Sequence, residues 1–369
     1  MSFMTMTKTI RTICYYAVGI VGFFAYAPYA HPQEETGTIN VGFIGAFSGS
    51  AQAYGDASRN GFELALQELQ EKRIKVIYED DQLTPLKTVS AFNKLLASND
   101  NIDLVITLAS GPSSAVAPLA QKKGIALLAW ASDRRVSESR PMVIRSYPSG
   151  EAEGELAACE AKKRAAGKNI GMLISNNPYC QSWRNGVVPA IGAEGIKMDE
   201  ELSEDLTDFK PLLLKAKSKG IKAFGICLNS GQNSLFARQA KQILGELLIF
   251  GCEYLHDKAE IQMANGALVG SWFATIETTA DFRQRYVKKF GNDNVLSGAA
   301  VHYDIAYMLS DILKKKETVD LTKALLSLGK RHGAIGAYEL KDEGGDRYID
   351  AKLAIKEVTP EGFVVRECN

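Results

Sequence analysis

Short apolar runs alternate with amphipathic segments along most of the chain. The apolar runs that predict strands are "INVGFIGAF", "IKVIYED", "DLVITLAS", "GIALLAWAS", "NIGMLIS", "KAFGICLN", "ELLIFGC" and "ALVGSWFA". Several are apolar at consecutive positions, which is typical of parallel strands covered by helices on both faces. Between them, Phe62, Ala65, Leu66 and Leu69 form an apolar stripe at helical spacing. This alternation predicts an α/β fold built on doubly wound parallel sheets.

The alternation pauses once, and this pause divides the chain into two lobes. It stops in "MVIRSYPSGEAEG", residues 142–154, and then restarts. The segment "GAYELKDEGGDRYIDAKLAIKEV" alternates like a hairpin with its turn at residues 343–346. The predicted lobes are discontinuous: a first lobe of residues 38–149 and 278–334, and a second lobe of residues 150–277 and 335–369. Two such lobes imply a cleft lined by the loops that follow the strands.

The first 30 residues differ in kind from the rest. Lys8 and Arg11 precede an apolar stretch from Ile13 to Ala27. A stretch of about 15 apolar residues suits the central region of a signal peptide better than a membrane span, which needs about 18 or more. Residues 1–30 therefore predict a signal peptide and a secreted or periplasmic protein, although Pro28 leaves the cleavage point open. The alternative is an uncleaved membrane anchor.

Charge and cysteine content exclude several classes of protein. Lys and Arg together number 43, as do Asp and Glu, so charge gives no reason to expect a nucleic-acid partner. The cysteines that follow the predicted signal peptide are Cys159, Cys180, Cys227, Cys252 and Cys368. Their odd number and scattered spacing do not form a disulfide framework, and the sequence has no C-x-x-C pair to suggest a zinc site.

Three of these cysteines share a position in the predicted second lobe. Cys180, Cys227 and Cys252 fall at or just past strand ends, so they are expected to cluster behind the cleft floor. They are interpreted as small packing residues. A Cys227–Cys252 bridge is the alternative, since an oxidising compartment permits disulfides.

The sequence offers no catalytic constellation. It contains no phosphate-binding loop, no G-x-S-x-G elbow and no H-E-x-x-H motif, and its four histidines lie far apart. The paired acids Asp80 and Asp81 raise the question of a glycosidase. Adjacent residues on an extended chain point to opposite faces, so these two carboxylates cannot flank one bond. We therefore expect neither an enzyme nor a cofactor.

Several segments, taken in order, resemble one known family. These are "INVGFIGAFSGSAQAYGDASRNGFELAL", "VIYEDDQ", "ASGPSSAVAPLAQKKGIALLAWAS", "DFKPLLLKAK", "FARQAK", "IFGCEYL" and "AAVHYDIAYMLSDIL". Between about residues 39 and 360 the chain is similar to the type I periplasmic solute-binding proteins of ABC transporters, the leucine/isoleucine/valine-binding group. The resemblance implies two lobes that close over a small molecule in the cleft.

Carried across one position at a time, the resemblance also implies ligand-binding residues. Ser113 in "GPSSAVAP" matches the serine that holds the ligand carboxylate, and Glu253 in "FGCEYL" matches the acid that anchors the ligand ammonium. Tyr179 in "NNPYC" matches a second-lobe tyrosine that closes on the ligand, and Tyr54 matches an aromatic wall. At Ala131 the matching contribution is that of the backbone.

Each of these side chains also has a structural interpretation. Ser113 can be the N-cap of its helix, and a serine at a helix start can serve both purposes. Tyr179 can be a partly exposed aromatic at a strand end. Glu253 can pair with a lysine or arginine across the cleft, because a buried carboxylate needs a partner.

Two positions depart from the family pattern. Asp133 stands where the family usually has a hydroxyl residue. As a second acid beside Glu253, it would favour an amine-bearing or cationic ligand; alternatively it pairs with Arg134 or Arg135 and does not face the ligand. Residues 229–232, "NSGQ", replace an aromatic, which makes the wall more polar and argues against a branched aliphatic ligand.

The sequence thus predicts the solute-binding component of an ABC importer, which binds an amino acid or a similar amine-bearing solute by lobe closure. The expected partners are that small molecule and an ABC permease in the inner membrane, and the protein is expected to act as a periplasmic monomer without cofactor or metal. The alternative is a sensory module of the same fold that serves a receptor. The identity of the ligand stays open.

Overall fold

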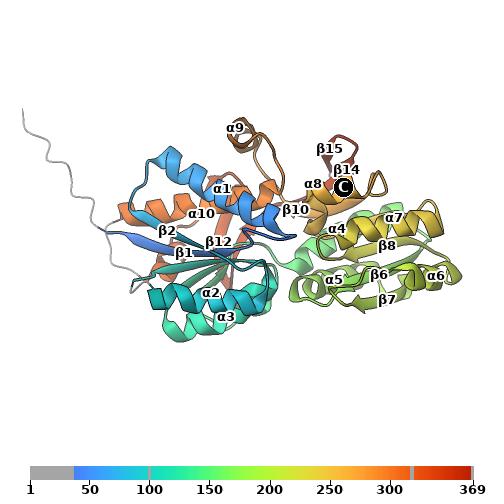
Figure 1. The fold of residues 1–369 in the computed structure, drawn as a ribbon, viewed down its shortest axis with the longest axis horizontal. Coiled ribbons are helices and arrows are strands. Elements are labelled where there is room, and N and C mark those ends of the chain that lie inside the picture. Colours follow the sequence, from blue (N-terminus) through green and yellow to red (C-terminus); the bar gives the residue numbers. More distant parts are fainter. Residues whose placement is uncertain (1–36, 99–100, 316–319, 367–369) are drawn as a thin grey trace, which may run out of the picture. The chain divides into compact units, whose positions relative to one another are not determined.

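Two β-sheets organise the residues that this computed structural model describes, namely 37–98, 101–315 and 320–366 (Figure 1). These residues fall into one compact unit. The predicted signal peptide, residues 1–30, lies outside them. Among the helices of the described ranges, none is long and apolar enough to cross a membrane.

The first sheet has the strand order β11-β12-β13-β5-β4-β3-β1-β2. Its strands are β1 (Ile39–Gly45), β2 (Ile74–Asp80), β3 (Leu104–Leu108), β4 (Ala126–Trp130), β5 (Val143–Arg145), β11 (Arg331–Gly333), β12 (Gly336–Glu343) and β13 (Asp346–Ala351). Strands β1 to β5 pair in parallel, and β11, β12 and β13 pair with one another antiparallel.

Helices cover both faces of the first sheet, as the apolar runs predict. One face packs against α1 (Gln52–Leu69) and α10 (Leu296–Lys314), the other against α2 (Pro85–Ser98) and α3 (Ser110–Lys123) (Figure 1). Successive residues of β3 alternate between the two cores: Leu104 and Ile106 join the first, and Val105 joins the second. The remaining helical segments are η1 (Arg134–Val136), α9 (Ala280–Phe290) and α11 (Leu321–Leu326).

The second sheet has the strand order β15-β14-β10-β9-β8-β6-β7. Its strands are β6 (Asn169–Ser175), β7 (Ile196–Leu202), β8 (Ile221–Cys227), β9 (Leu248–Gly251), β10 (Trp272–Ile276), β14 (Leu353–Thr359) and β15 (Gly362–Arg366). One face packs against α4 (Gly150–Arg164) and α5 (Pro178–Ile191), the other against α6 (Lys210–Ser218), α7 (Gln232–Leu244) and α8 (Lys258–Met263). The short segments η2 (Ala193–Gly195) and η3 (Glu253–His256) complete this half.

The chain passes from one sheet to the other three times, and the last passage differs from the prediction. Residues 335–369 were assigned to the second lobe, but β12 and β13 pair within the first sheet. Only β14 and β15 join the second sheet. The hairpin and its turn form as predicted, between Glu343 and Asp346. The alternating pattern determines the hairpin, but it does not determine which sheet the hairpin joins.

Candidate ligand-binding site

One pocket lies where loops at the carboxyl ends of the strands of both sheets meet. Its described lining consists of Tyr54, Leu83, Leu108, Ala109, Ser110, Trp130, Ala131, Ser132, Tyr147, Tyr179, Glu253 and Tyr254. The space between them, including the part that opens to solvent, is about 450 Å³. None of these lining residues is a lysine, arginine or histidine, and Glu253 is the one acid among them.

A continuous series of aromatic rings forms most of the wall. The Tyr54 ring lies 6.2 Å from that of Trp130 and 6.0 Å from that of Tyr254, measured between centroids. Trp130 contacts Tyr147 at 6.0 Å, and Tyr254 contacts Tyr179 at 5.1 Å. Three of the rings follow strands of the first sheet, and Tyr179 and Tyr254 follow strands of the second. The wall is therefore assembled from both halves of the molecule.

Glu253 follows β9 and is held by hydroxyl groups. Its Oε1 accepts hydrogen bonds from Thr275 Oγ1 at 2.7 Å and from Ser297 Oγ at 2.5 Å. Burial acts to raise the pKa of this carboxyl, but the nearby His256 and the hydrogen bonds from Ser297 and Thr275 together outweigh burial and hold the pKa below its ordinary value. Glu253 therefore carries a negative charge at neutral pH.

A buried polar chain continues behind Glu253. His256 Nδ1 lies 3.3 Å from Ser297 Oγ, and Lys356 Nζ lies 3.1 Å from His256 Nε2. Burial and the nearby Lys356 lower the pKa of His256 to about 4, so the imidazole is neutral at pH 7. Because Lys356 donates to Nε2, the ring proton belongs on Nδ1, which donates to Ser297. Ser297 can then donate to Glu253.

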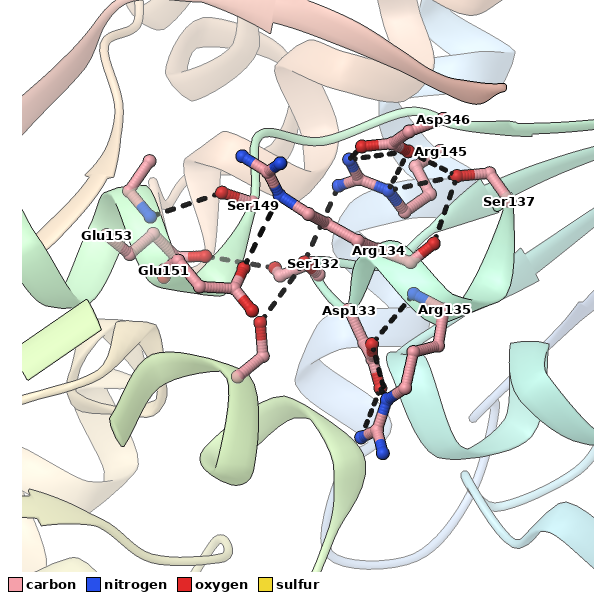
Figure 2. Close-up of polar contacts among 12 residues, drawn as sticks. Ser132, Asp133, Arg134, Arg135, Ser137, Arg145, Ser149, Glu151, Glu153 and Asp346 are labelled. Atoms are coloured by element: carbon pink, nitrogen blue, oxygen red, sulfur yellow. Dashed lines mark hydrogen bonds and ion pairs between the residues drawn. The ribbon is translucent and has the colours of Figure 1, made fainter. Parts of the chain in front are cut away.

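A second carboxyl lies behind the pocket wall. Glu153, in the first turn of α4, is fully buried. Its Oε1 lies 2.9 Å from Ser132 Oγ and its Oε2 lies 2.7 Å from the Tyr179 hydroxyl (Figure 2 shows the Ser132 contact). Burial and the charge of Glu253 raise its pKa well above the ordinary value. Sequence reasoning missed Glu153, because an acid in the first turn of a helix is common on electrostatic grounds alone.

Most of the residues that the sequence singled out meet in this pocket. Tyr54, Ala131, Tyr179 and Glu253 line it. Ser113 is buried outside it, where its hydroxyl lies 2.9 Å from Thr107 Oγ1. Ser113 is not the N-cap either, since the helix begins at Ser110 with Ala109 as its N-cap.

Ser110 lines the pocket in place of Ser113. The hydroxyl of Ser110 accepts hydrogen bonds from the backbone N–H groups of Ser132 at 3.1 Å and Asp133 at 3.2 Å. The physical reason is the start of α3: its first residue faces the cleft, and a residue three positions later lies on the sheet side of the helix. The sequence "ASGPSSAV" contains three serines, and spacing alone does not say which of them comes first in the helix.

Asp133 does not line the pocket and has a local partner instead. Its carboxylate accepts from the backbone N–H of Arg135 at 2.9 Å and forms an ion pair with the Arg135 guanidinium at 2.7 Å (Figure 2). This is the pairing that the sequence left open as an alternative. Arg134 points toward Glu151 at the start of α4, at 3.8 Å, and Arg135 donates to Gln181 on α5 at 3.3 Å. These arginines link the two halves at the rim of the cleft.

Three cysteine sulfurs lie together beneath Tyr179 and Glu253. The sulfurs of Cys180, Cys227 and Cys252 all lie within 4.8 Å of one another, as the strand ends predict. A disulfide joins Cys180 to Cys227, and Cys252 is a buried free thiol. The Cys227–Cys252 bridge considered from the sequence is therefore wrong. Cys180, which follows Tyr179 at the start of α5, is the residue bonded to Cys227 instead.

Two lobes of mainly parallel α/β structure thus meet at an aromatic pocket that contains one acid. A model of the periplasmic binding protein family matches residues 38–355. The chain belongs to this family. Its relatives are solute-binding proteins rather than enzymes.

Individual relatives are distant in sequence and near in fold. The chain is 24% identical over 276 residues to the Leu/Ile/Val-binding protein BraC3 of Rhizobium johnstonii, an alignment that covers 72% of each chain. The leucine-binding protein LivK of Thermotoga maritima superposes with a TM-score of 0.80 at 18% identity, covering 89% of this chain and 98% of that one. A solute-binding protein of Rhodopseudomonas palustris in complex with 3,4-dihydroxybenzoic acid superposes with a TM-score of 0.77 at 20% identity. The match covers 89% of this chain and 95% of that one. At these identities the likeness of the solved structures shows the fold alone.

Proposed function

We propose that this protein is the extracytoplasmic component of an ABC importer and that it binds an amine-bearing small solute between its lobes. It acts as a monomer, captures the solute in the periplasm and presents it to a permease in the inner membrane. The support is the family membership together with the chemistry of the pocket. The proposed ligand-binding residues are Tyr54, Ser110, Ala131, Tyr179 and Glu253.

The observation that carries the proposal is the state of Glu253. It is a buried carboxylate whose Oε1 accepts two hydroxyl groups, while no described residue donates a hydrogen bond to Oε2. A buried charge with unused acceptor capacity costs stability unless a cation satisfies it. No basic residue lines the pocket, so the cation is best supplied by the ligand.

The same chemistry argues against an aromatic acid as the ligand. One structural relative was solved with 3,4-dihydroxybenzoic acid. In this chain an anion would enter a pocket that already holds a carboxylate and lacks a basic side chain. A ligand carboxylate is acceptable only when the ammonium of the same molecule neutralises Glu253. It would then bind near Ser110 at the start of α3, where backbone N–H groups favour a negative charge.

Lobe closure would complete the site. Residues from both sheets form the wall, so a ligand that touches both stabilises the closed form. Contacts across the cleft are already present: the Tyr54 hydroxyl lies 3.4 Å from the Tyr254 carbonyl oxygen, and Arg134 faces Glu151.

Isothermal titration calorimetry tests the proposal, on protein that has first been unfolded to remove any bound ligand and then refolded. Leucine, its deaminated analogue 4-methylpentanoate and its decarboxylated analogue isopentylamine would be titrated in parallel. We expect binding only from compounds that contain the amine, and at least a tenfold loss of affinity in Glu253→Gln. The exposed Glu246→Gln is the matched control, because it removes the same charge far from the pocket. Binding of 4-methylpentanoate, with no change in Glu253→Gln, would refute the role of the amine.

A further inference from the structure

Five aromatic rings surround the position that Glu253 faces. Tyr54, Trp130, Tyr147, Tyr179 and Tyr254 line the pocket, and each ring contacts the next in series at centroid distances between 5.1 and 6.2 Å. The faces of aromatic rings carry negative charge density, and a cation within about 6 Å of them is attracted most strongly when water is excluded. Tyr54, Trp130, Tyr147 and Tyr179 are at least nine-tenths buried, and Tyr254 is partly buried.

The hydroxyl groups of Tyr54, Tyr147 and Tyr179 are engaged elsewhere, that of Tyr54 with the Tyr254 carbonyl oxygen at 3.4 Å. The Tyr147 hydroxyl accepts from the backbone N–H of Ile276 at 3.1 Å and lies 3.3 Å from Thr275 Oγ1. The Tyr179 hydroxyl accepts from the backbone N–H of Glu253 at 2.9 Å and bonds Glu153. Both residues therefore offer the ligand ring surface rather than a hydrogen-bonding group.

Several other oxygen atoms of the wall are also in use. Ser110 Oγ accepts two backbone N–H groups, and Ser132 Oγ bonds Glu153. The carbonyl oxygen of Ala109 accepts from the backbone of α3, and that of Trp130 accepts from Ala109. Oε2 of Glu253 is the charged acceptor of the described lining, and no described residue donates a hydrogen bond to it.

This distribution of charge and acceptors distinguishes between kinds of ammonium. A primary ammonium brings three N–H donors, and a buried donor without an acceptor is costly. An ammonium whose hydrogens are replaced by alkyl groups carries the same positive charge but needs few or no acceptors. Its charge is spread over methyl groups that pack well against rings.

We propose that the aromatic pocket selects an N-alkylated ammonium group, tertiary or quaternary, over a primary ammonium. The inference rests on the proposed function and specifies its ligand. Glu253 supplies the counter-charge, and the five rings enclose the alkylated nitrogen. The rings of Tyr179 and Tyr254 come from one lobe and those of Tyr54, Trp130 and Tyr147 from the other, so the closed lobes hold all five around the nitrogen.

The test compares two probes that differ only in three methyl groups. Propylamine and propyltrimethylammonium would be titrated into the refolded wild-type protein, with tetramethylammonium as the minimal probe. We expect propyltrimethylammonium to bind at least tenfold more tightly than propylamine. Equal or tighter binding of propylamine would overturn this inference and leave the proposed function standing. If neither cation binds while benzoate or 4-methylpentanoate does, both fall.

Substitutions at Trp130 distinguish the effect of losing an aromatic ring from the effect of losing folded protein. Trp130→Leu removes a ring from the wall, and Trp130→Phe is the matched control that keeps one. The measured quantity is the ratio of the two dissociation constants, which a general loss of folded protein does not change. We expect the preference for propyltrimethylammonium to fall at least fivefold in Trp130→Leu and to stay within about twofold in Trp130→Phe. An unchanged ratio in Trp130→Leu would overturn the inference.

Discussion

The two buried carboxyls of the cleft differ in the direction of their pKa shifts, so replacing Glu153 by an uncharged amide should cost little stability. The pKa of Glu253 lies below its ordinary value, whereas burial and the charge of Glu253 raise the pKa of Glu153 well above its ordinary value and favour its protonated form. In Glu153→Gln an uncharged side chain of the same shape replaces one that is already uncharged. It can keep the contacts with Ser132 and Tyr179. At pH 5 we expect a change in unfolding free energy below about 1 kcal/mol.

The stability difference between Glu153→Gln and the wild type should depend on pH in a defined direction. The pKa of Glu153 in the folded protein lies above its ordinary value of 4.5. Its stabilising contribution is therefore fully present below about pH 4.5 and is lost as the pH rises toward the folded pKa. Between these two pH values the unfolding free energy of the wild type falls by up to about 1.4 kcal/mol per pH unit relative to that of Glu153→Gln, because the glutamine cannot ionise. For a chain of this size, 1 kcal/mol corresponds to about 2 °C in Tm.

Thermal unfolding measured at pH 5, 6, 7 and 8 is the assay. The difference in Tm between Glu153→Gln and the wild type should be near zero at pH 5 and should grow in favour of the variant as the pH rises. Glu153→Ala serves as the contrasting variant: it leaves the Ser132 and Tyr179 hydroxyls without this partner and opens a cavity, at a cost of about 2–4 kcal/mol at every pH. A Glu153→Gln difference that stays constant with pH, or that favours the wild type at pH 8, would refute the assigned protonation.

Three further outcomes follow from the fold. Ala109 adopts φ 64° and ψ 153°, a region open mainly to glycine. Ala109→Gly should therefore raise the unfolding free energy, measured in urea, by about 1 kcal/mol. A decrease would show that Ala109 is unstrained. Peptide mapping by mass spectrometry without reductant should recover Cys180 linked to Cys227, while Cys252 resists alkylation until the protein is denatured; a Cys227–Cys252 peptide would contradict this pairing. A Cβ on Gly61 would lie 1.9 Å from a backbone oxygen of α10, so Gly61→Ala should lower Tm by several degrees, and an unchanged Tm would mean that the two helices separate easily.

The sequence predicts most of the fold because the cores are built from short apolar runs. Every predicted strand run contains a strand, and both faces of each sheet are covered by helices. The pattern gave no sign of β7, whose sequence "IKMDEEL" is largely polar because it lies at the edge of its sheet. It also left β5 out, since three residues are too few to show a period.

The site was most predictable where a residue lies close to the end of a strand. Glu253 and Tyr179 follow strands directly, and the structure places both in the pocket. Ser113 and Ser110 differ by part of a helical turn, so the exact first residue of α3 decides which one faces the cleft. For Asp133 the sequence left two alternatives open, a position facing the ligand and a pairing with an arginine. Only the coordinates show that it pairs with Arg135. Glu153 comes from a helix start more than ninety positions away from Glu253 in the sequence.

The three passages of the chain between the sheets have a consequence for how the protein folds. β13 lies inside the first sheet, between β12 and β5, and β14 lies inside the second, between β15 and β10. A chain that emerges with its amino end first therefore exposes the open edges of β5 and β10 until residue 353 and beyond have appeared. Unpaired edges invite association with other chains. Neither half can mature as an independent nascent domain, and the chain must be kept from aggregating until its last strands close both sheets together.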